Sequence, residues 1–511
     1  MAEYTKLKIG NASDNGQVTI VDEDRLCYLV KSVSKGAVGL RTLSKPLLQE
    51  FVAYMEQHPD VPANEVRFKI SGQSDIDKYE YGYGATISVM ANMVLGRTPI
   101  HHEGKNPKSQ EINAASIFLH RPYLTALRTK PFMLLAGISG TGKSRIVRKL
   151  AQATTTQHYA KEENRWKDNR PENFELIQVK PNWHNSMDVV GFFSNISKRY
   201  EFTPFVEFIV KAWQHKDTPY FLCLDEMNLA PVEEYFAEFL SAIESRSTDK
   251  NDEYITDPII KPFIEYDSDS DEKKVSDQMI AQLIGSLDTE DKRKLAEHFR
   301  NKGLTLPPNL MVMGTVNMDE TTFSFSRKVL DRAMSVEMNE VDYDKFLSGE
   351  SEQFPLLTDM NDLLVNRPQR AAEVTEEIES DKVIAYLKEV NTLMDGTPFK
   401  LGYRAANEAM LYVAACKKFA GSDYALAKAL DEFTLMKILS RIEGDDSRLG
   451  IADNDPRIAK LGIEASEQHI SLLTCLRAIV RKHIGASSET EKKIDQMCST
   501  LEREHFVSYW A

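Results

Sequence analysis

The chain has 511 residues, of which 42% are hydrophobic, and its 63 Lys and Arg against 77 Asp and Glu give a net charge of −14 at pH 7. This apolar content is enough for two to four domains of about 100–200 residues each, so disorder along the whole chain is excluded. The negative charge argues against a generic polyanion-binding protein, because basic contacts to phosphate supply most of the non-specific affinity for nucleic acids.

Membrane and disulfide signals are both missing from the sequence pattern. The apolar runs are far shorter than the roughly 20 residues that a membrane-spanning helix needs, and no secretory signal follows the first charges. The five cysteines are scattered and lack CxxC spacing, which is typical of a reducing compartment and argues against a structural zinc site. We therefore expect a cytoplasmic protein with no membrane contact.

Residues 1–112 form the first expected domain, a small α+β or mostly helical unit whose role the sequence does not reveal. A helical pattern covers residues 45–57, and a Gly- and Tyr-rich stretch follows at 78–96. Tyrosines at alternate positions in such a stretch pack a strand or turn more often than they stack on a nucleic-acid base.

Residues 113–340 form the second expected domain, in which buried strands alternate with helices. The expected strands are 131–137, 174–179, 220–226 and 309–317. Each is a continuous apolar run, as expected for a parallel sheet that helices cover on both faces. An acidic segment at 245–276 indicates a solvated loop or insertion.

Residues 341–511 form the third expected domain, which is helical and shows no strand signals. Amphipathic patterns at 408–419, 425–442 and 467–483 indicate its helices. The predicted fold class is therefore α/β, with a P-loop parallel sheet followed by a helical domain and preceded by the small N-terminal domain.

A phosphate-binding motif follows the first of these strands. GxxxxGK[ST] is matched by Gly137, Ile138, Ser139, Gly140, Thr141, Gly142, Lys143 and Ser144. The motif lies between an apolar strand and a helical pattern at 145–156, where backbone N–H groups and the helix N-terminus converge on phosphate oxygens. In this arrangement Lys143 neutralises phosphate, and Ser144 offers its hydroxyl to Mg²⁺.

Three further groups complete a hydrolytic site by their positions at strand ends. Asp225 and Glu226 end the strand at 220–226, so that Asp225 orders Mg²⁺ and Glu226 acts as the general base for water. Asn317 ends the last strand and orients the water or contacts the γ-phosphate. Each residue alone also fits an ordinary strand end or turn, since Asn is a common turn former.

An arginine beyond the site is a candidate finger for the nucleotide of a neighbouring subunit. Arg332 lies in the segment 325–333, and Arg327 in the same segment is its rival. Such an arginine stabilises transition-state charge on the transferred phosphoryl group. The alternative for either residue is a salt bridge on a surface helix.

Five segments in this order resemble an AAA+ NTPase module of the McrB-like branch, the motor subunits of modification-dependent restriction systems. The segments are 137–144, 178–195, 224–245, 314–333 and 401–410. The resemblance extends from residue 113 to 445 and does not reach residues 1–112. It implies a ring, most simply a hexamer, that hydrolyses GTP or ATP with Mg²⁺ and drives a separate McrC-like nuclease subunit on DNA.

The resemblance also implies roles for individual residues. Lys143 and Ser144 match the Walker A positions, and Asp225 and Glu226 match the Walker B pair. Asn317 matches sensor 1, and Arg332 lies in the region that supplies the trans-acting arginine. Arg404, in the expected C-terminal helical domain, is similar to the sensor-2 arginine of the lid, which reports on the γ-phosphate. The segment 191–202 is similar to a hairpin inserted in this branch.

Two questions stay open in the sequence. McrB-like proteins carry Asn-Thr-Ala-Asp at sensor 1, where this chain has Asn317, Met318, Asp319 and Glu320, so GTP and ATP both remain candidates. The acidic balance also fits a second function class, a MoxR-like chaperone that uses the same ring to remodel a protein client. No convincing nuclease constellation is present in this chain, which favours a separate nuclease in the first case.

Overall fold

The computed structural model describes residues 18–23, 27–34, 37–58, 66, 83–95, 121–154, 171–250, 253–269, 274–318, 323–339, 363, 368–421, 424–452, 454–462 and 470–510. The chain divides into two compact units. One contains Met1–Gln110 and Thr155–Pro171, and the other contains Glu111–Thr154 and Glu172–Ala511.

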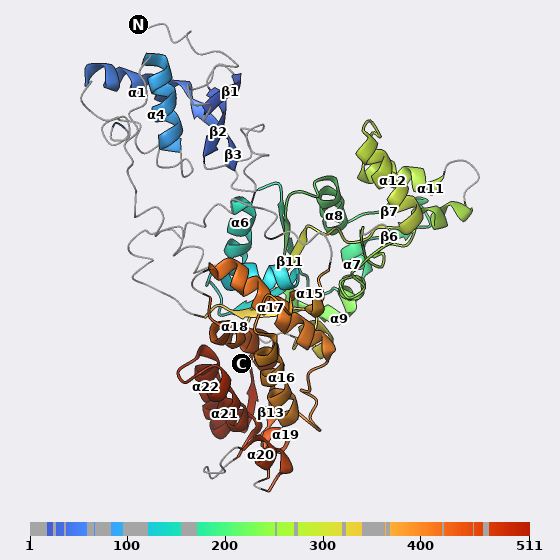
Figure 1. Cartoon of the computed structure of the whole chain (residues 1–511). Coiled ribbons are helices and arrows are strands. Elements are labelled where there is room, and N and C mark those ends of the chain that lie inside the picture. The colour runs from blue at the N-terminus through green and yellow to red at the C-terminus, as the bar shows by residue number, and fades with distance from the viewer. Residues whose placement is uncertain are drawn as a thin grey trace. The chain divides into compact units, whose positions relative to one another are not determined.

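Within its described residues, the first unit combines an antiparallel sheet with the helices α1 and α4 (Figure 1). Its strands β1 (Val18–Glu23), β2 (Cys27–Ser34) and β3 (Ala37–Ser44) pair in chain order. Helix α1 has the bounds Lys45–Gln57, which confirms the predicted helix, and it packs against α4 (Tyr83–Leu95). Residues 78–82 of the Tyr-rich stretch lie outside the described residues.

A five-stranded parallel sheet lies at the centre of the second unit. Its strands are β4 (Phe132–Gly137), β5 (Phe174–Gln178), β8 (Tyr220–Asp225), β11 (Leu310–Asn317) and β12 (Met334–Glu337). The order across the sheet is β12-β4-β11-β8-β5. The four predicted strands are confirmed, whereas β12 was not predicted because four residues with a polar Ser335 give little periodic signal.

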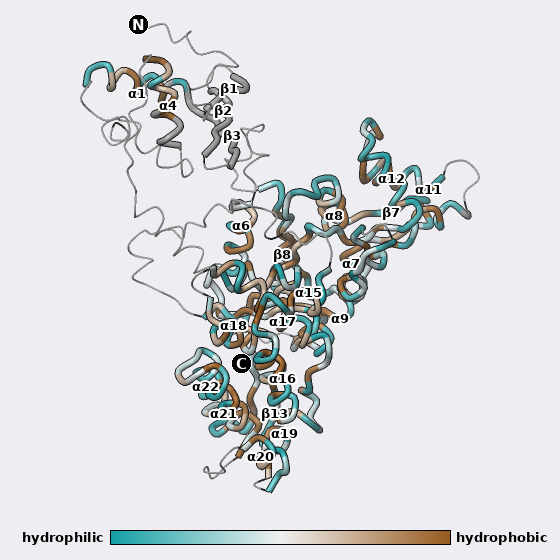
Figure 2. The backbone as a smooth tube through the Cα atoms, viewed as in Figure 1, coloured by the Kyte–Doolittle hydropathy of each residue, from teal (hydrophilic) through white to brown (hydrophobic). Residues whose placement is uncertain are grey.

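Alternate side chains of each strand enter two different hydrophobic cores. Met133, Leu135 and Met313 lie in the core that also contains the C-terminal helices, whereas Leu134 and Val312 lie in the core on the opposite face. This alternation is the period of two of a β-strand, and both faces are apolar because both are covered. The strands accordingly contain hydrophobic runs in Figure 2. The sequence-level expectation of an α/β sheet covered on both faces is confirmed.

Short helices and a hairpin connect these strands. They are α6 (Lys143–Ala153), α7 (Met187–Val190), β6 (Phe192–Ser194), β7 (Arg199–Glu201), α8 (Pro204–Gln214), η4 (Met227–Leu229), α9 (Val232–Tyr235), α10 (Ala237–Ala242) and α13 (Arg327–Leu330). Strands β6 and β7 pair antiparallel and form the expected hairpin. Thr203 begins α8 as a cap, because its Oγ1 accepts from the Val206 N–H.

The segment at 245–276 is more ordered than the sequence indicates. It includes β9 (Ser247–Thr248), β10 (Tyr254–Ile255) and η5 (Phe263–Asp269), and α11 (Val275–Leu283) and α12 (Glu290–Lys302) follow. The prediction of a solvated loop is wrong for its middle part, because Ile259, Ile260 and Phe263 are buried. These apolar residues interrupt the acidic runs and anchor the segment to the core.

The C-terminal part is helical, as predicted. Its elements are α15 (Ala371–Val374), α16 (Ser380–Leu393), α17 (Tyr403–Ala420), α18 (Leu426–Phe433), the π-turn η8 (Thr434–Ile438), η9 (Leu439–Arg441), α19 (Asp446–Leu449), α20 (Pro456–Leu461), α21 (Leu472–His483) and α22 (Glu489–Glu504). A pair of short strands, β13 (Glu443–Asp445) and β14 (Phe506–Ser508), was not predicted. Among the described helices, none has the length and apolar character needed to cross a bilayer.

Candidate functional site

The loop between β4 and α6 is the centre of the candidate site. Gly140 and Gly142 each have a φ of 85°, a left-handed conformation that costs other residues about 1–2 kcal/mol. Gly137 lacks a side chain for a different reason, because a Cβ there would lie 2.4 Å from the carbonyl oxygen of Met338. The loop therefore turns directly from a buried strand into the first turn of a helix.

Lys143 is the first residue of α6, and its side chain folds back into this loop. Nζ donates to the carbonyl oxygens of Gly137 at 2.9 Å and Ile138 at 2.8 Å, and the residue is only 6% exposed. A buried ammonium needs such partners. Phosphate oxygens are stronger acceptors than carbonyls, because their hydrogen bonds to an ammonium are assisted by charge on both sides.

Three other residues of the segment 137–144 carry hydroxyl groups. Thr141 Oγ1 donates to the Ile138 carbonyl at 3.1 Å, while Ser139 is exposed and Ser144 is half-buried in the first turn of α6. No acidic residue lies in that first turn, so the positive end of the helix dipole is not neutralised locally. The loop is therefore suited to an anion.

Asp225 ends β8 and Glu226 follows it, and a buried threonine on β11 orients both of them. Thr315 Oγ1 donates to Asp225 Oδ1 at 2.8 Å and accepts from the Glu226 N–H at 2.9 Å. Thr315 is 2% exposed, so these bonds are shielded from competing water. One hydroxyl thus fixes the direction of the Asp225 carboxylate and the path of the backbone into Glu226.

Glu226 has a backbone conformation that non-glycine residues seldom adopt. Its φ is 52° and its ψ is 51°, a left-handed state that is costly unless surrounding contacts hold it. The Asn317 side-chain amide donates to Glu226 Oε1 at 3.4 Å, a long bond that is still within hydrogen-bonding range. Strain at a carboxylate held between two neighbouring strands is typical of a functional residue.

The strand register brings these groups to the same edge of the sheet as the loop. Asn317 is opposite Gly137, and Gly314 is opposite Leu224, which places Thr315 level with Asp225. Because side chains alternate along a strand, Thr315 and Asn317 share a face of β11 with Met313. That is the face whose core includes the helix α6, so the carboxyl edge and the start of α6 form one site.

The end of β12 adds a residue that the sequence did not indicate. Asn339 Oδ1 accepts from the Ile138 N–H at 3.0 Å, and its amide donates to Glu337. Asn339 therefore supports the loop from the strand next to β4. No sequence signal pointed to it, because a single Asn after a short strand is ordinary.

The oxygen ligands for a divalent cation in this site are few. In the part of the chain that the structure describes, no group of three or more His, Cys, Asp or Glu side chains could hold a metal ion. A carboxylate at Asp225 and a hydroxyl at Ser144 match Mg²⁺, which keeps most of its waters and takes one or two protein ligands together with substrate phosphates. The residues present therefore fit a magnesium–nucleotide complex.

Arg332 and Arg404 lie at the edge of the sheet opposite to the loop 137–144. Arg332 lies two residues before Met334, the first residue of β12, which is opposite Met133 near the start of β4. The loop, in contrast, follows the end of β4. Six strand residues span about 20 Å, which exceeds the reach of an arginine side chain. Arg404 contacts the same carboxylate as Arg332, that of Glu244, so neither arginine lies at the loop of its own chain.

Arg327, the second candidate for the arginine finger, contacts other residues. Arg327 NH1 donates to the Pro398 carbonyl at 3.2 Å, and its guanidinium lies 5.3 Å from the centre of the Phe399 ring. These contacts tie α13 to the segment before α17.

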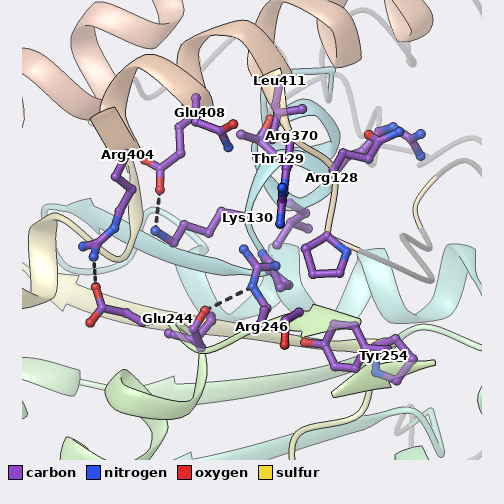
Figure 3. A pocket seen from close by; sticks show the side chains of 18 of the residues that line it. Arg128, Thr129, Lys130, Glu244, Arg246, Tyr254, Arg370, Arg404, Glu408 and Leu411 are labelled. Atoms are coloured by element: carbon purple, nitrogen blue, oxygen red, sulfur yellow. Dashed lines mark hydrogen bonds and ion pairs between the residues drawn. The ribbon is translucent and has the colours of Figure 1, made fainter. Parts of the chain in front are cut away.

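Buried charges hold the backbone on both sides of Arg332. Lys437 Nζ donates to the carbonyls of Leu330, Asp331 and Ala333 at 3.2, 3.0 and 2.9 Å. The Glu408 carboxylate lies 2.9 Å from Lys437 and also pairs with Lys130 (Figure 3).

The pKa values of this cluster follow from one carboxylate shared by two lysines. Burial by itself raises the pKa of Glu408, but the charges of Lys437 and Lys130 outweigh it and lower the pKa to about 2. Burial lowers the pKa of Lys130 to about 7, and the Lys437 charge adds to this effect against the attraction of Glu408. Lys130 therefore gives up its proton near neutral pH in the folded protein.

A pocket of about 460 Å³ opens beside these charges, at the edge of the sheet away from the loop (Figure 3). Its charged lining residues are Arg128, Lys130, Glu244, Arg246, Arg370, Glu373, Arg404 and Glu408. The pocket lies between the sheet and the start of α17, and its cationic side chains outnumber its acidic ones.

Sequence reasoning missed the residues that support this arrangement. Thr315 carried a usable signal, because a polar residue in an apolar strand two positions before Asn317 shares its face. Glu244 and Lys437 carried none, because isolated charges in helical segments usually lie on a solvated surface. Trp183, which precedes the hairpin in the chain, is 8% exposed, and its ring centre lies 5.3 Å from that of Tyr235.

The C-terminal part of the chain matches the profile of a known family. The profile of a family described as a domain of unknown function (DUF8727) matches residues 359–506. The matched part corresponds to the C-terminal helical region and leaves the sheet and the loop uncovered. No curated protein matches the chain.

Proposed function

We propose that this chain is a nucleoside triphosphatase that binds GTP or ATP, with Mg²⁺, at the loop 137–144. The proposal rests on the two hydrogen bonds of the Thr315 hydroxyl, which hold Asp225 and Glu226 at the same edge of the sheet as the loop. A phosphate-binding loop alone supports binding. A strained carboxylate beside it supports hydrolysis as well, because a general base must be held near the phosphate.

Each residue has one part in the proposed reaction. Lys143 moves from the loop carbonyls to the phosphate oxygens and neutralises their charge. Glu226 accepts a proton from the attacking water, and Asn317 keeps Oε1 of Glu226 oriented for it. Ser144 and Asp225 hold Mg²⁺, which supplies charge neutralisation on the phosphates.

The separation of the arginines from the loop supports action between subunits. Because Arg332 lies at the opposite edge of the sheet from its own loop, its guanidinium can reach only the nucleotide of another copy. We therefore propose a homo-oligomeric ring, most simply a hexamer, in which each loop faces the Arg332 of a neighbour.

Two biological settings fit a ring-forming triphosphatase of this kind. The order of the motifs supports an McrB-like motor that works with a McrC-like nuclease subunit and meets DNA through the complex. The MoxR-like chaperone remains the second class. Co-purification separates them, since a nuclease partner favours the first and a von Willebrand-type metal-binding partner favours the second.

The substitution Glu226→Gln tests the proposed chemistry. It keeps the size of the side chain and removes its basicity, so hydrolysis of GTP and ATP should fall by about 100-fold or more, while binding of a fluorescent nucleotide stays unchanged. The matched control is Glu234→Gln, at an exposed glutamate on α9, which should hydrolyse at the wild-type rate. Normal turnover by Glu226→Gln would refute the assignment of the general base.

A further inference from the structure

Glu244 joins Arg332, which the proposed function places on the neighbour-facing side, to a second arginine, Arg404. Its Oε1 pairs with Arg404 and its Oε2 with Arg332 (Figure 3 shows the first pair). Arg404 is the second residue of helix α17 in the C-terminal helical part, whereas Arg332 lies just before strand β12 of the sheet. A single carboxylate thus brings together guanidiniums from two parts of the fold that are far apart in sequence.

The arginines keep donors available while they are paired. Arg332 donates from one terminal nitrogen to Glu244 and from the other to the Lys328 carbonyl at 2.7 Å, so each terminal nitrogen keeps one N–H. Its side chain is 17% exposed, and its Nε is buried without a hydrogen-bond partner within the described residues. The Arg404 side chain is 49% exposed. An arginine has five N–H donors, so pairing with Glu244 leaves both side chains able to bind a second anion.

Two guanidiniums at one place repel each other unless an anion lies between them. Glu244 offsets that repulsion, and the backbone around Arg332 is already held by Lys437 and by Arg441, which pairs with Asp331 at 2.7 Å. The side chain of Arg332 is therefore the part that still needs orienting. The cationic pocket beside Arg404 leaves room for an anionic ligand at this face.

We propose that Glu244 is a positioning residue that holds Arg332 and Arg404 together as a paired finger for the triphosphate bound by a neighbouring copy of this chain. This inference rests on the proposed function, and it adds Arg404 to the same trans-acting face as Arg332. Glu244 does not contact the nucleotide. It orients both arginines before assembly, so that neither has to be ordered during the reaction.

Mixing two inactive variants tests this proposal. A Lys143→Ala chain cannot use its own loop but presents intact arginines, and an Arg332→Ala chain has an intact loop but no finger. Their mixture should regain nucleotide hydrolysis at interfaces where the intact parts meet. Adding Glu244→Gln to the Lys143→Ala chain should reduce the regained kcat by about 10- to 100-fold, because misplacement by about 1 Å costs up to this much.

Position within the assembly separates this role from a merely structural one. Glu244→Gln added to the Arg332→Ala chain should leave the regained rate and the nucleotide affinity unchanged. Glu389→Gln is the matched control in the Lys143→Ala chain, because its carboxylate also joins two basic side chains, Lys482 and His483, and it should have no effect. Arg404→Ala in the Lys143→Ala chain should lower the rate as Glu244→Gln does.

The outcomes distinguish failure of the inference from failure of the proposed function. An equal loss when Glu244→Gln is placed in either chain, or a loss in neither chain, overturns the positioning role while leaving the triphosphatase intact. No hydrolysis by the wild-type protein overturns the proposed function and the inference with it. An active wild type whose variant mixture regains nothing overturns the trans-acting finger and the positioning role with it, and leaves the triphosphatase intact.

Discussion

Replacement of Lys437 by methionine is the sharpest test of how the sheet and the helical region are joined. Lys437 is 1% exposed and lies in the π-turn η8, a rare helix form that often occurs at functional positions. Its ammonium bonds to three carbonyls around Arg332 and pairs with Glu408. Methionine has a similar length but supplies no donor, so all four contacts are lost.

The expected loss of stability follows from these contacts. Breaking a buried ion pair by removing one partner costs about 3–5 kcal/mol, because the remaining charge stays buried. Glu408 retains Lys130, and the Asp331 carbonyl also accepts from Lys130 at 3.2 Å, so we expect a value near the middle, about 4 kcal/mol. At about 2 °C per kcal/mol, the low end of the range for large domains, the melting temperature falls by about 8 °C.

Intrinsic fluorescence during thermal and urea unfolding measures this change. Trp510 reports on the region, because its indole N–H donates to the Ser440 carbonyl at 2.8 Å, close to η8. The control is Lys400→Met, which removes a pair with Asp395 whose side chains are 55% and 64% exposed and should cost at most about 1 kcal/mol. If the two variants lose the same stability, the buried cluster does not hold the two regions together.

Two other predictions concern protonation and assembly. Burial lowers the pKa of Lys130 from 10.5 to about 7, so between these values the unfolded chain holds a proton that the folded chain has released. The free energy of unfolding should therefore rise with pH above 7, by up to about 1.4 kcal/mol per unit, and Lys130→Met should flatten this slope in urea titrations at pH 7, 8 and 9; equal slopes would contradict it. Saturating non-hydrolysable GTP or ATP should convert the protein to a ring, and a monomer by light scattering under both nucleotides would remove the arginine-finger mechanism.

Local sequence determined the parts of the site that depend on neighbouring residues. The loop from Gly137 to Ser144 is recognisable because glycine spacing, an apolar strand before it and a helix after it all lie within a short segment. The four longer strands are recognisable for the same reason, since each is an apolar run long enough to be buried on both faces. Strand β12 was not predicted because it is short. Strands β13 and β14 were not predicted because runs of three residues show no periodicity.

Tertiary structure alone decided which charges meet. Thr315 hydrogen-bonds to both Asp225 and Glu226 because strands β11 and β8 pair. This pairing brings together residues about 90 positions apart, and no local pattern encodes it. Glu244 likewise meets Arg332 and Arg404 only because α10, β12 and α17 converge at one edge of the sheet. The sequence by itself determined the glycine-rich loop at 137–144 and the carboxylates of Asp225 and Glu226 at the end of strand β8. The fold decided that the arginines lie at the other edge, because parallel strands carry their two ends to opposite sides of the sheet.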